Sequence, residues 1–217
     1  MYGNIKTTFA VACCIATTQA MQLETQASYT CTTTSDRNKS DLPDFASILS
    51  AGQKWTDPVF PHNDEALLWK SRGEARPTGL EGVNLEFKRI SETSLKNNLL
   101  WGSNGITVDD VRQGMLGNCW YKAAASSIAE VPGRMEKIFH NTENKLNSAG
   151  IYAVDFYSLG VLHTVIVDDY LPMMHNGEKY QTVFAEMTKD KSMWPAILEK
   201  AFAKYHGNYG HTEGGNS

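Results

Sequence analysis

The chain has 217 residues, of which 41% are hydrophobic and 10% aromatic, so it has enough apolar side chains for the core of one domain or two small ones. Its formal net charge of −4 excludes the broad positive field on which sequence-independent nucleic-acid binding depends, and no nucleic-acid partner is predicted. The four cysteines, at positions 13, 14, 31 and 119, include no Cys-x-x-Cys pair. Neither a zinc site nor a disulfide framework is therefore expected.

Residues 1–20 have the three parts of a signal peptide. A single lysine precedes the short apolar run TFAVACCIAT, and Ala20 offers a small residue at a cleavage point. This pattern predicts entry into the secretory pathway; the alternative is the ordinary start of a cytoplasmic protein. The apolar run is far shorter than the roughly 20 residues that span a bilayer, and no later stretch reaches that length, so no membrane span is predicted.

Residues 21–41 are predicted to be a polar linker, because they are rich in Ser and Thr and carry too little apolar surface to offset the entropy of ordering. The folded domain is predicted to occupy residues 42–217. Its first part, WTDPVFPHNDEALLW, contains two prolines that favour extended or turn geometry before a helical preference returns. The three glycines and one proline of residues 71–84 predict an exposed loop.

A helix is predicted over residues 119–129, directly after the helix-breaking pair Gly117-Asn118. One side of this helix collects apolar residues at helical spacing and is expected to pack inward. These residues are Cys119, Trp120, Ala123, Ala124 and Ile128.

Residues 151–171 are predicted to form a β-hairpin. YAVDFY and VLHTVIVDD are rich in aromatic and β-branched residues, a Ser-Leu-Gly turn joins them, and Leu171-Pro172 is expected to end the second strand. A second amphipathic helix is predicted in WPAILEKAFAKY, where Pro195 suits a first helical turn. Helices together with a hairpin indicate the α+β class.

Cys119 lies in the first turn of its predicted helix, where unpaired backbone N–H groups and the helix dipole favour a thiolate. Its own amide is a candidate oxyanion donor, and Gln113 on the preceding loop carries a side-chain amide that is a second candidate. The alternative is a buried thiol that packs as a small apolar residue, which is the commoner fate of a free cysteine. Position alone leaves both interpretations open.

The string QGMLGNCW, with Asp110 three residues before it, resembles the active-site segment of the calpain family of cysteine endopeptidases. Three further stretches resemble family segments in the expected order: the entry segment in WTDPVFPHNDEALLW, the hairpin in GIYAVDFYSLGVLHTVIVDDYLP, and the Leu-Glu-Lys-Ala-(Tyr/Phe)-Ala-Lys helix in MWPAILEKAFAKYHGNY. The resemblance covers residues 55–215. Gly-Asn-Cys-Trp alone is less specific, because papain-like proteases and transglutaminases carry similar strings.

The resemblance implies the amino-terminal half of a papain-like α+β core, with a central helix that bears the cysteine. It also implies a calcium-dependent endopeptidase that cleaves protein substrates through a thioester. In this family Cys119 corresponds to the nucleophile, Gln113 to the oxyanion-hole side chain, and Trp120 to a residue packed behind the nucleophile. Transglutaminase-like acyl transfer is the less favoured enzyme alternative.

A Ca²⁺ site is also implied by the resemblance. The matching positions are Asp110 and Glu199, with backbone carbonyls near Ser103 and Gly105. Such hard oxygen ligands suit calcium. Without the resemblance, the two carboxylates would be interpreted as solvated surface charges.

The family's catalytic histidine and asparagine lie in a second half-domain, in strings such as Gly-His-Ala-Tyr and Arg-Asn-Pro-Trp-Gly. Neither string occurs in this chain, and none of its six histidines matches the position of a base aimed at the thiolate. The missing partners argue against hydrolysis by this chain alone. Three explanations stay open: a truncated sequence, a fragment completed by a second chain that supplies the His/Asn half, and an inert calpain-derived module that binds peptides or calcium.

Three charged residues, Lys122 and the pair Asp168-Asp169, have less specific interpretations. Lys122 stands where the family commonly has an apolar residue, and it predicts a more polar face on the cysteine-bearing helix. The pair Asp168-Asp169 lies at a strand end before Leu-Pro, which predicts a structural or salt-bridging role rather than an acid/base dyad.

Overall fold

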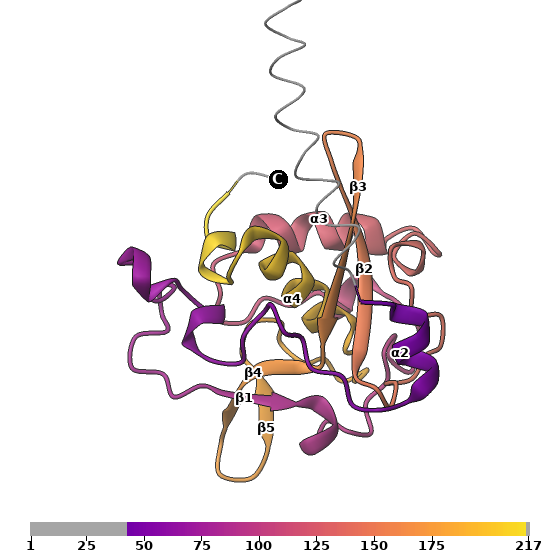
Figure 1. The fold of residues 1–217 in the computed structure, drawn as a ribbon, viewed down its shortest axis with the longest axis horizontal. Helices are drawn as coiled ribbons and strands as arrows, with labels where there is room; N and C mark the ends of the chain where they lie inside the picture. The colour runs from indigo at the N-terminus through magenta and orange to yellow at the C-terminus, as the bar shows by residue number, and fades with distance from the viewer. Residues whose placement is uncertain (1–42, 216–217) are drawn as a thin grey trace, which may run out of the picture. The chain divides into compact units, whose positions relative to one another are not determined.

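The computed structural model describes residues 43–215; the predicted signal peptide and linker lie outside the described residues. Within this range the chain forms three α-helices and five strands joined by short 3₁₀ turns (Figure 1). The helices are α2 (Phe45–Ala51), α3 (Cys119–Ala129) and α4 (Trp194–His206), and the strands are β1 (Glu86–Arg89), β2 (Ile151–Ser158), β3 (Val161–Asp168), β4 (Tyr170–His175) and β5 (Tyr180–Thr182). This is a mixed helix-and-sheet domain with small antiparallel sheets. None of the helices in this range combines the length and the hydropathy needed to cross a bilayer.

The predicted hairpin is confirmed as β2 and β3, which pair antiparallel from Ile151 opposite Asp168 to Ser158 opposite Val161. Leu159 and Gly160 form its two-residue turn, with φ of 51° and 78°. Positive φ at both central positions is the turn geometry that fits the right-handed twist of paired strands. The tip of the hairpin projects past the helices (Figure 1).

The predicted strand end at Leu171-Pro172 is wrong, because the chain continues as β4, the central strand of the sheet β1-β4-β5. In an antiparallel strand the N–H and C=O of one residue point to the same neighbour. The carbonyl of Pro172 accepts from Val183 N on the β5 side, where paired residues begin only at Met173. The absent N–H of Pro172 therefore removes no bond between β1 and β4, which explains why a proline is tolerated here.

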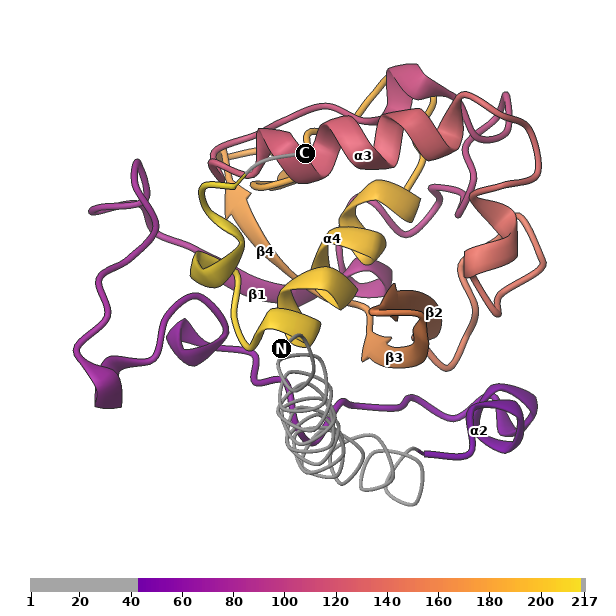
Figure 2. The same ribbon diagram turned by 90° about the horizontal axis from the view of Figure 1, so that it is seen from above.

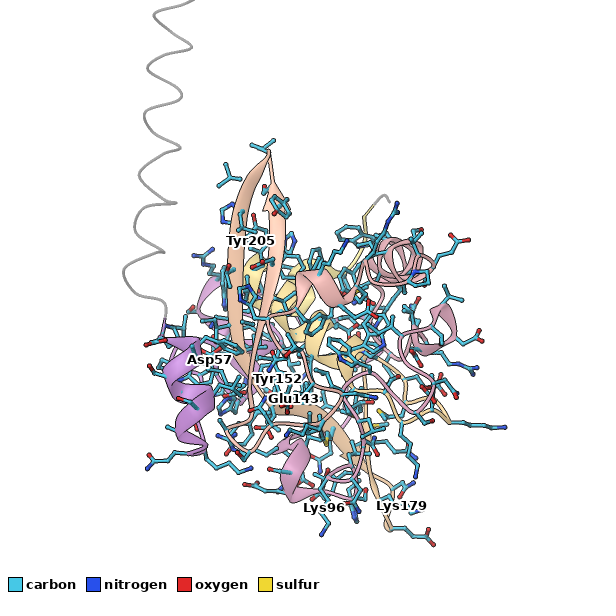
Figure 3. All side chains as sticks on the ribbon, turned by 90° about the vertical axis from the view of Figure 1, so that its right-hand side faces the viewer. Asp57, Lys96, Glu143, Tyr152, Lys179 and Tyr205 are labelled. Carbon is cyan, nitrogen blue, oxygen red and sulfur yellow. The ribbon has the colours of Figure 1, made fainter. Side chains whose placement is uncertain are left out.

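Helix α4 confirms the second predicted helix and lies between α3 and the hairpin (Figure 2). Pro195 occupies its first turn, where a proline N–H would lack an intrahelical partner in any case. Toward α3, the Phe202 ring stacks on Tyr121 with centroids 4.4 Å apart. Toward the hairpin, Tyr205 packs against Phe156 at 5.8 Å and lies beside β2 and β3 in Figure 3. Helix α4 thus joins the cysteine-bearing helix and the hairpin in one core.

Helix α3 has the predicted bounds, but the prediction of its buried face is wrong. The buried residues are Tyr121, Lys122, Ala125 and Ala129, whereas Cys119, Ala123, Ala124 and Ile128 are exposed and Trp120 is half-buried. Alanine tolerates either environment, so the alanines did not define a face. The stacking of Tyr121 on Phe202 and the buried partner of Lys122 orient the helix instead.

The structural role predicted for Asp168-Asp169 is confirmed. Asp168 is fully buried and bonded to Lys200 Nζ and to His62 Nε2 at 2.7 Å, and Asp169 pairs with the Arg89 guanidinium. Burial would raise the pKa of Asp168, but the charge and hydrogen bond of Lys200 outweigh it and hold the pKa below its usual value. These ion pairs connect the end of β3 to α4, and the residue between β3 and β4 to β1.

Candidate active site

Cys119 is the first residue of α3, and its thiol is free and exposed. The residues that anchor this corner are Leu116 and Asn118, which are both fully buried. The carbonyl of Gly117 accepts from Gly214 N at 3.1 Å, which fixes the turn before the helix. The thiol thus lies at a helix N-terminus, where unpaired N–H groups supply partial positive charge.

The loop before Cys119 lies on the segment after β5. Gly114 N donates to Phe184 O at 2.6 Å, and Met115 N donates to Val183 O at 2.9 Å. A side chain at Gly114 would place its Cβ 2.2 Å from Val183 O, so only glycine permits this close approach. The loop that carries Gln113 is therefore fixed to the domain by backbone bonds.

Gln113 is exposed, and its side-chain Nε2 donates to Leu116 O at 3.1 Å. Gln113 lies on this anchored loop, six residues before Cys119 at the start of α3, and its side chain is hydrogen bonded to Leu116 rather than to the cysteine. Rotation of the Gln113 side chain would break only the bond to Leu116.

The segment after α4 packs against the cysteine corner, although the Gly-rich sequence gave no signal of it. Trp120 Nε1 donates to Thr212 O at 3.0 Å. Gly215 lies so close to the Trp120 indole that a Cβ there would be 2.6 Å from the ring. Trp120 also packs edge-on against Phe202. The tryptophan after the cysteine is thus enclosed by α4 and by residues 212–215.

A buried polar cluster lies behind the first turn of α3. Glu199 Oε1 accepts from Asn118 Nδ2 at 2.7 Å and lies 2.8 Å from Lys122 Nζ. The approach of the ammonium lacks hydrogen-bond geometry, so this contact is an ion pair. Contrary to expectation, Lys122 lies on the buried face of the helix.

The two predicted carboxylate ligands, Asp110 and Glu199, have separate partners in the structure. Asp110 is buried, and its carboxylate accepts from Thr107 N at 2.9 Å and from Trp194 Nε1 at 3.1 Å. Glu199 has the separate partners Asn118 and Lys122. Within residues 43–215, no three His, Cys, Asp or Glu side chains are grouped as a metal site would require.

Asp190 is the carboxylate that lies against the loop of Ser103 and Gly105, and no sequence pattern singles it out. Its Oδ1 accepts from Asn104 N at 3.0 Å, from Asn104 Nδ2 at 2.9 Å and from the Ser103 hydroxyl. Thr188, two residues earlier, contacts Asp110 at 3.4 Å. Asp190 belongs to the polar stretch TKDKS, which has no periodicity that would distinguish it from a solvated loop.

In the part of the chain that the structure describes, none of the histidines is hydrogen bonded to Cys119. Three contact carboxylates: His62 contacts Asp168, His140 contacts Asp155, and His211 contacts Glu74. The others pack on aromatic rings: His163 on Tyr205, His175 on Tyr180, and His206 on Phe202. All six imidazoles thus contact groups other than the Cys119 thiol.

Comparison with known proteins identifies the family. Residues 55–217 match the family described as calpain family cysteine protease. The chain is 33% identical to calpain-5 of Mus musculus over 168 residues, which cover 74% of this chain and 24% of that protein. It is 31% identical to calpain-A of Drosophila melanogaster (82% and 20% covered) and 35% identical to the calpain-2 catalytic subunit of Homo sapiens (77% and 23%). The chain spans a quarter or less of the length of these relatives. The chain belongs to the calpain family of cysteine proteases.

Proposed function

We propose that this chain provides the cysteine-bearing part of a calpain-type endopeptidase, with Cys119 as the nucleophile that attacks peptide bonds of protein substrates. The observation that carries the proposal is the free, exposed thiol at the first residue of α3, within the part that matches the family. We further propose that α3, α4 and the hairpin form the amino-terminal half of a papain-like core.

In the proposed reaction, the Cys119 thiolate attacks the substrate carbonyl carbon, and a C–S bond forms as the carbonyl oxygen becomes an oxyanion. The backbone N–H of Cys119 and the side-chain amide of Gln113 are the proposed donors to that oxyanion. Gln113 would rotate away from Leu116 O to reach it. The C–N bond then breaks, the amine leaves with a proton, and water hydrolyses the thioester to a carboxylic acid and the free thiol.

The base that takes the thiol proton and returns it to the amine is a separate proposal. Because the described histidines are engaged elsewhere, we propose that an imidazole from outside residues 43–215, in a second chain or a further segment, completes the site. The same observation favours one alternative: a calpain-derived module that binds peptides or calcium without cleavage.

Calcium dependence is also a proposal, and the ligand chemistry of the structure modifies it. Glu199 does not fit as a ligand, because Lys122 already neutralises its charge. We propose instead that Ca²⁺ would bind the carbonyls near Ser103 and Gly105 with Asp190 and Asp110, hard oxygen donors of the kind calcium prefers. When bound, calcium would hold in place the loop that leads to Gln113.

Secretion is proposed from the sequence of residues 1–20. Amino-terminal sequencing of the native protein tests it: a start near Met21 is expected after cleavage, and an intact Met1 would refute it.

A peptidyl epoxide and a casein digestion assay, each with and without Ca²⁺, test the enzyme proposal. We expect mass spectrometry to find the epoxide on Cys119, and Cys119→Ala to remove that adduct. Casein cleavage in addition would show that the catalytic site is complete. Labelling without cleavage would support the reactive thiol and the need for an external base. Neither labelling nor cleavage at any calcium level would support the inert module.

A further inference from the structure

Glu199 contacts the first turn of α3 on both sides of Cys119. Its Oε1 meets Asn118, the residue before the cysteine, and Lys122, three residues after it. Positions 118 and 122 are four apart and therefore lie on one side of the helix, where a single carboxylate reaches both. The Cys119 thiol itself remains exposed.

The usual means of fixing a helix N-terminus is missing here. Asn118 is the N-cap residue, and asparagine commonly caps a helix by accepting a bond from a first-turn N–H. Its side chain makes no such bond in α3 and instead donates to Glu199. The first turn is thus held from α4 rather than by its own cap.

The three groups are buried: Asn118, Glu199 and Lys122 are 0%, 2% and 6% exposed. A hydrogen bond to a carboxylate is shorter and stronger than a neutral one, and low polarity around it strengthens it further. The carboxylate therefore fixes the backbone that presents the thiol.

We propose that Glu199 is a positioning residue for Cys119: it holds the first turn of α3 through Asn118 and Lys122, and so fixes the direction of the thiol. This inference rests on the proposed role of Cys119 as the nucleophile. Glu199 does not touch the substrate and acts only through the helix.

The experiment compares two reagents on the native chain. Iodoacetamide, which is small, reports the intrinsic reactivity of Cys119, whereas a peptidyl epoxide requires a directed thiol. The double variant Glu199→Leu with Lys122→Met removes the contact without leaving a buried charge unpaired. Because misplacement by an ångström costs up to about 100-fold, we expect the epoxide rate to fall about tenfold relative to the iodoacetamide rate.

Rescue and control variants separate positioning from stability. The double variant Glu199→Gln with Lys122→Met keeps an oxygen acceptor for Asn118. Its ratio of epoxide to iodoacetamide labelling rates should recover to within about threefold of wild type. Lys204→Met is the matched control, because Lys204 lies on the same helix but pairs with Asp57, away from α3. Its ratio should stay within about twofold of wild type. Asn118→Ala should lower the ratio as much as Glu199→Leu with Lys122→Met does. If that double variant does not fold, Asn118→Ala takes its place in the comparison.

Each outcome decides the inference. An unchanged ratio in the folded leucine variant, or in Asn118→Ala, would reduce Glu199 to a purely structural role. A fall equally large in Lys204→Met would do the same. If the wild-type thiol reacts with neither reagent, the nucleophile role of Cys119 fails and the inference fails with it, a result distinct from the loss of the ratio alone.

Discussion

Lys122 Nζ on α3 lies 2.8 Å from Glu199 Oε1 on α4, with only 7% and 3% of the two side chains exposed. Taking either charge out of water is costly, and their attraction and the bond from Asn118 offset that cost. This ion pair joins the helix of the candidate nucleophile to the central helix of the core.

Removal of the Lys122 ammonium should leave the Glu199 carboxylate buried without its counter-charge. Lys122→Met is expected to lower the free energy of unfolding by about 3–5 kcal/mol, whereas its combination with Glu199→Leu should restore most of that loss. Urea denaturation followed by circular dichroism measures both values.

Lys145→Met is the control for that prediction, because Lys145 forms an ion pair with Glu143 in which both side chains are about two-thirds exposed. Its effect should stay below about 1 kcal/mol. Equal losses in Lys122→Met and Lys145→Met would show that the buried pair contributes nothing special.

Some features of the site could be read from the sequence and others could not. The bounds of the cysteine helix followed from Gly117-Asn118, and the hairpin followed from its alternating pattern. The inward face of the helix did not follow, because alanine carries no strong preference and a buried lysine is recognised only from its partner in another helix. The contact of Asp190 with Ser103 could not be predicted either, because 87 residues of chain separate the two.

Asp190 and Glu199 distinguish the two assignments of the calcium ligands. Asp190→Asn should weaken Ca²⁺ binding at least about tenfold in isothermal titration calorimetry, because it removes a charged oxygen donor. Glu199→Gln should change the Ca²⁺ affinity less than about twofold. The matched control for Asp190→Asn is Asp109→Asn, because Asp109 is exposed. A loss confined to Glu199→Gln would instead favour Glu199 as the ligand, and absence of binding in the wild type would exclude the calcium proposal.

Gly114 tests the attachment of the loop that carries Gln113. Gly114→Ala forces a Cβ against Val183 O and should lower the free energy of unfolding by about 1–3 kcal/mol and slow epoxide labelling of Cys119. Gly117→Ala meets only the Glu213 side chain at 3.3 Å, so it should have the smaller effect in both measurements. The reverse order would contradict the backbone contact.

The His211–Glu74 contact should make stability depend on pH. Burial lowers the pKa of His211, but the hydrogen bond to Glu74 at 2.8 Å and the bond to the His206 carbonyl outweigh it, so the net pKa is raised. The contribution of this contact to the stability of the folded state is therefore complete below about pH 6.5, the pKa of histidine in the unfolded chain. It is lost as pH rises through the pKa of His211 in the folded chain.

Glu74→Gln isolates that contribution from the other histidines. The difference in Tm between wild type and this variant should be largest near pH 5.5 and shrink toward pH 8. Thermal melts across this range measure it. A difference that is constant or grows with pH would contradict the assigned direction.

The central claim, that Cys119 is an activated nucleophile, is tested most directly within one molecule by the labelling rates of Cys119 and Cys31. Mass spectrometry of the native chain treated with a peptidyl epoxide measures both rates. A thiol at a helix N-terminus should react at least about tenfold faster than Cys31 in the native chain, and the difference should vanish in urea. Equal rates in the native chain would contradict the claim.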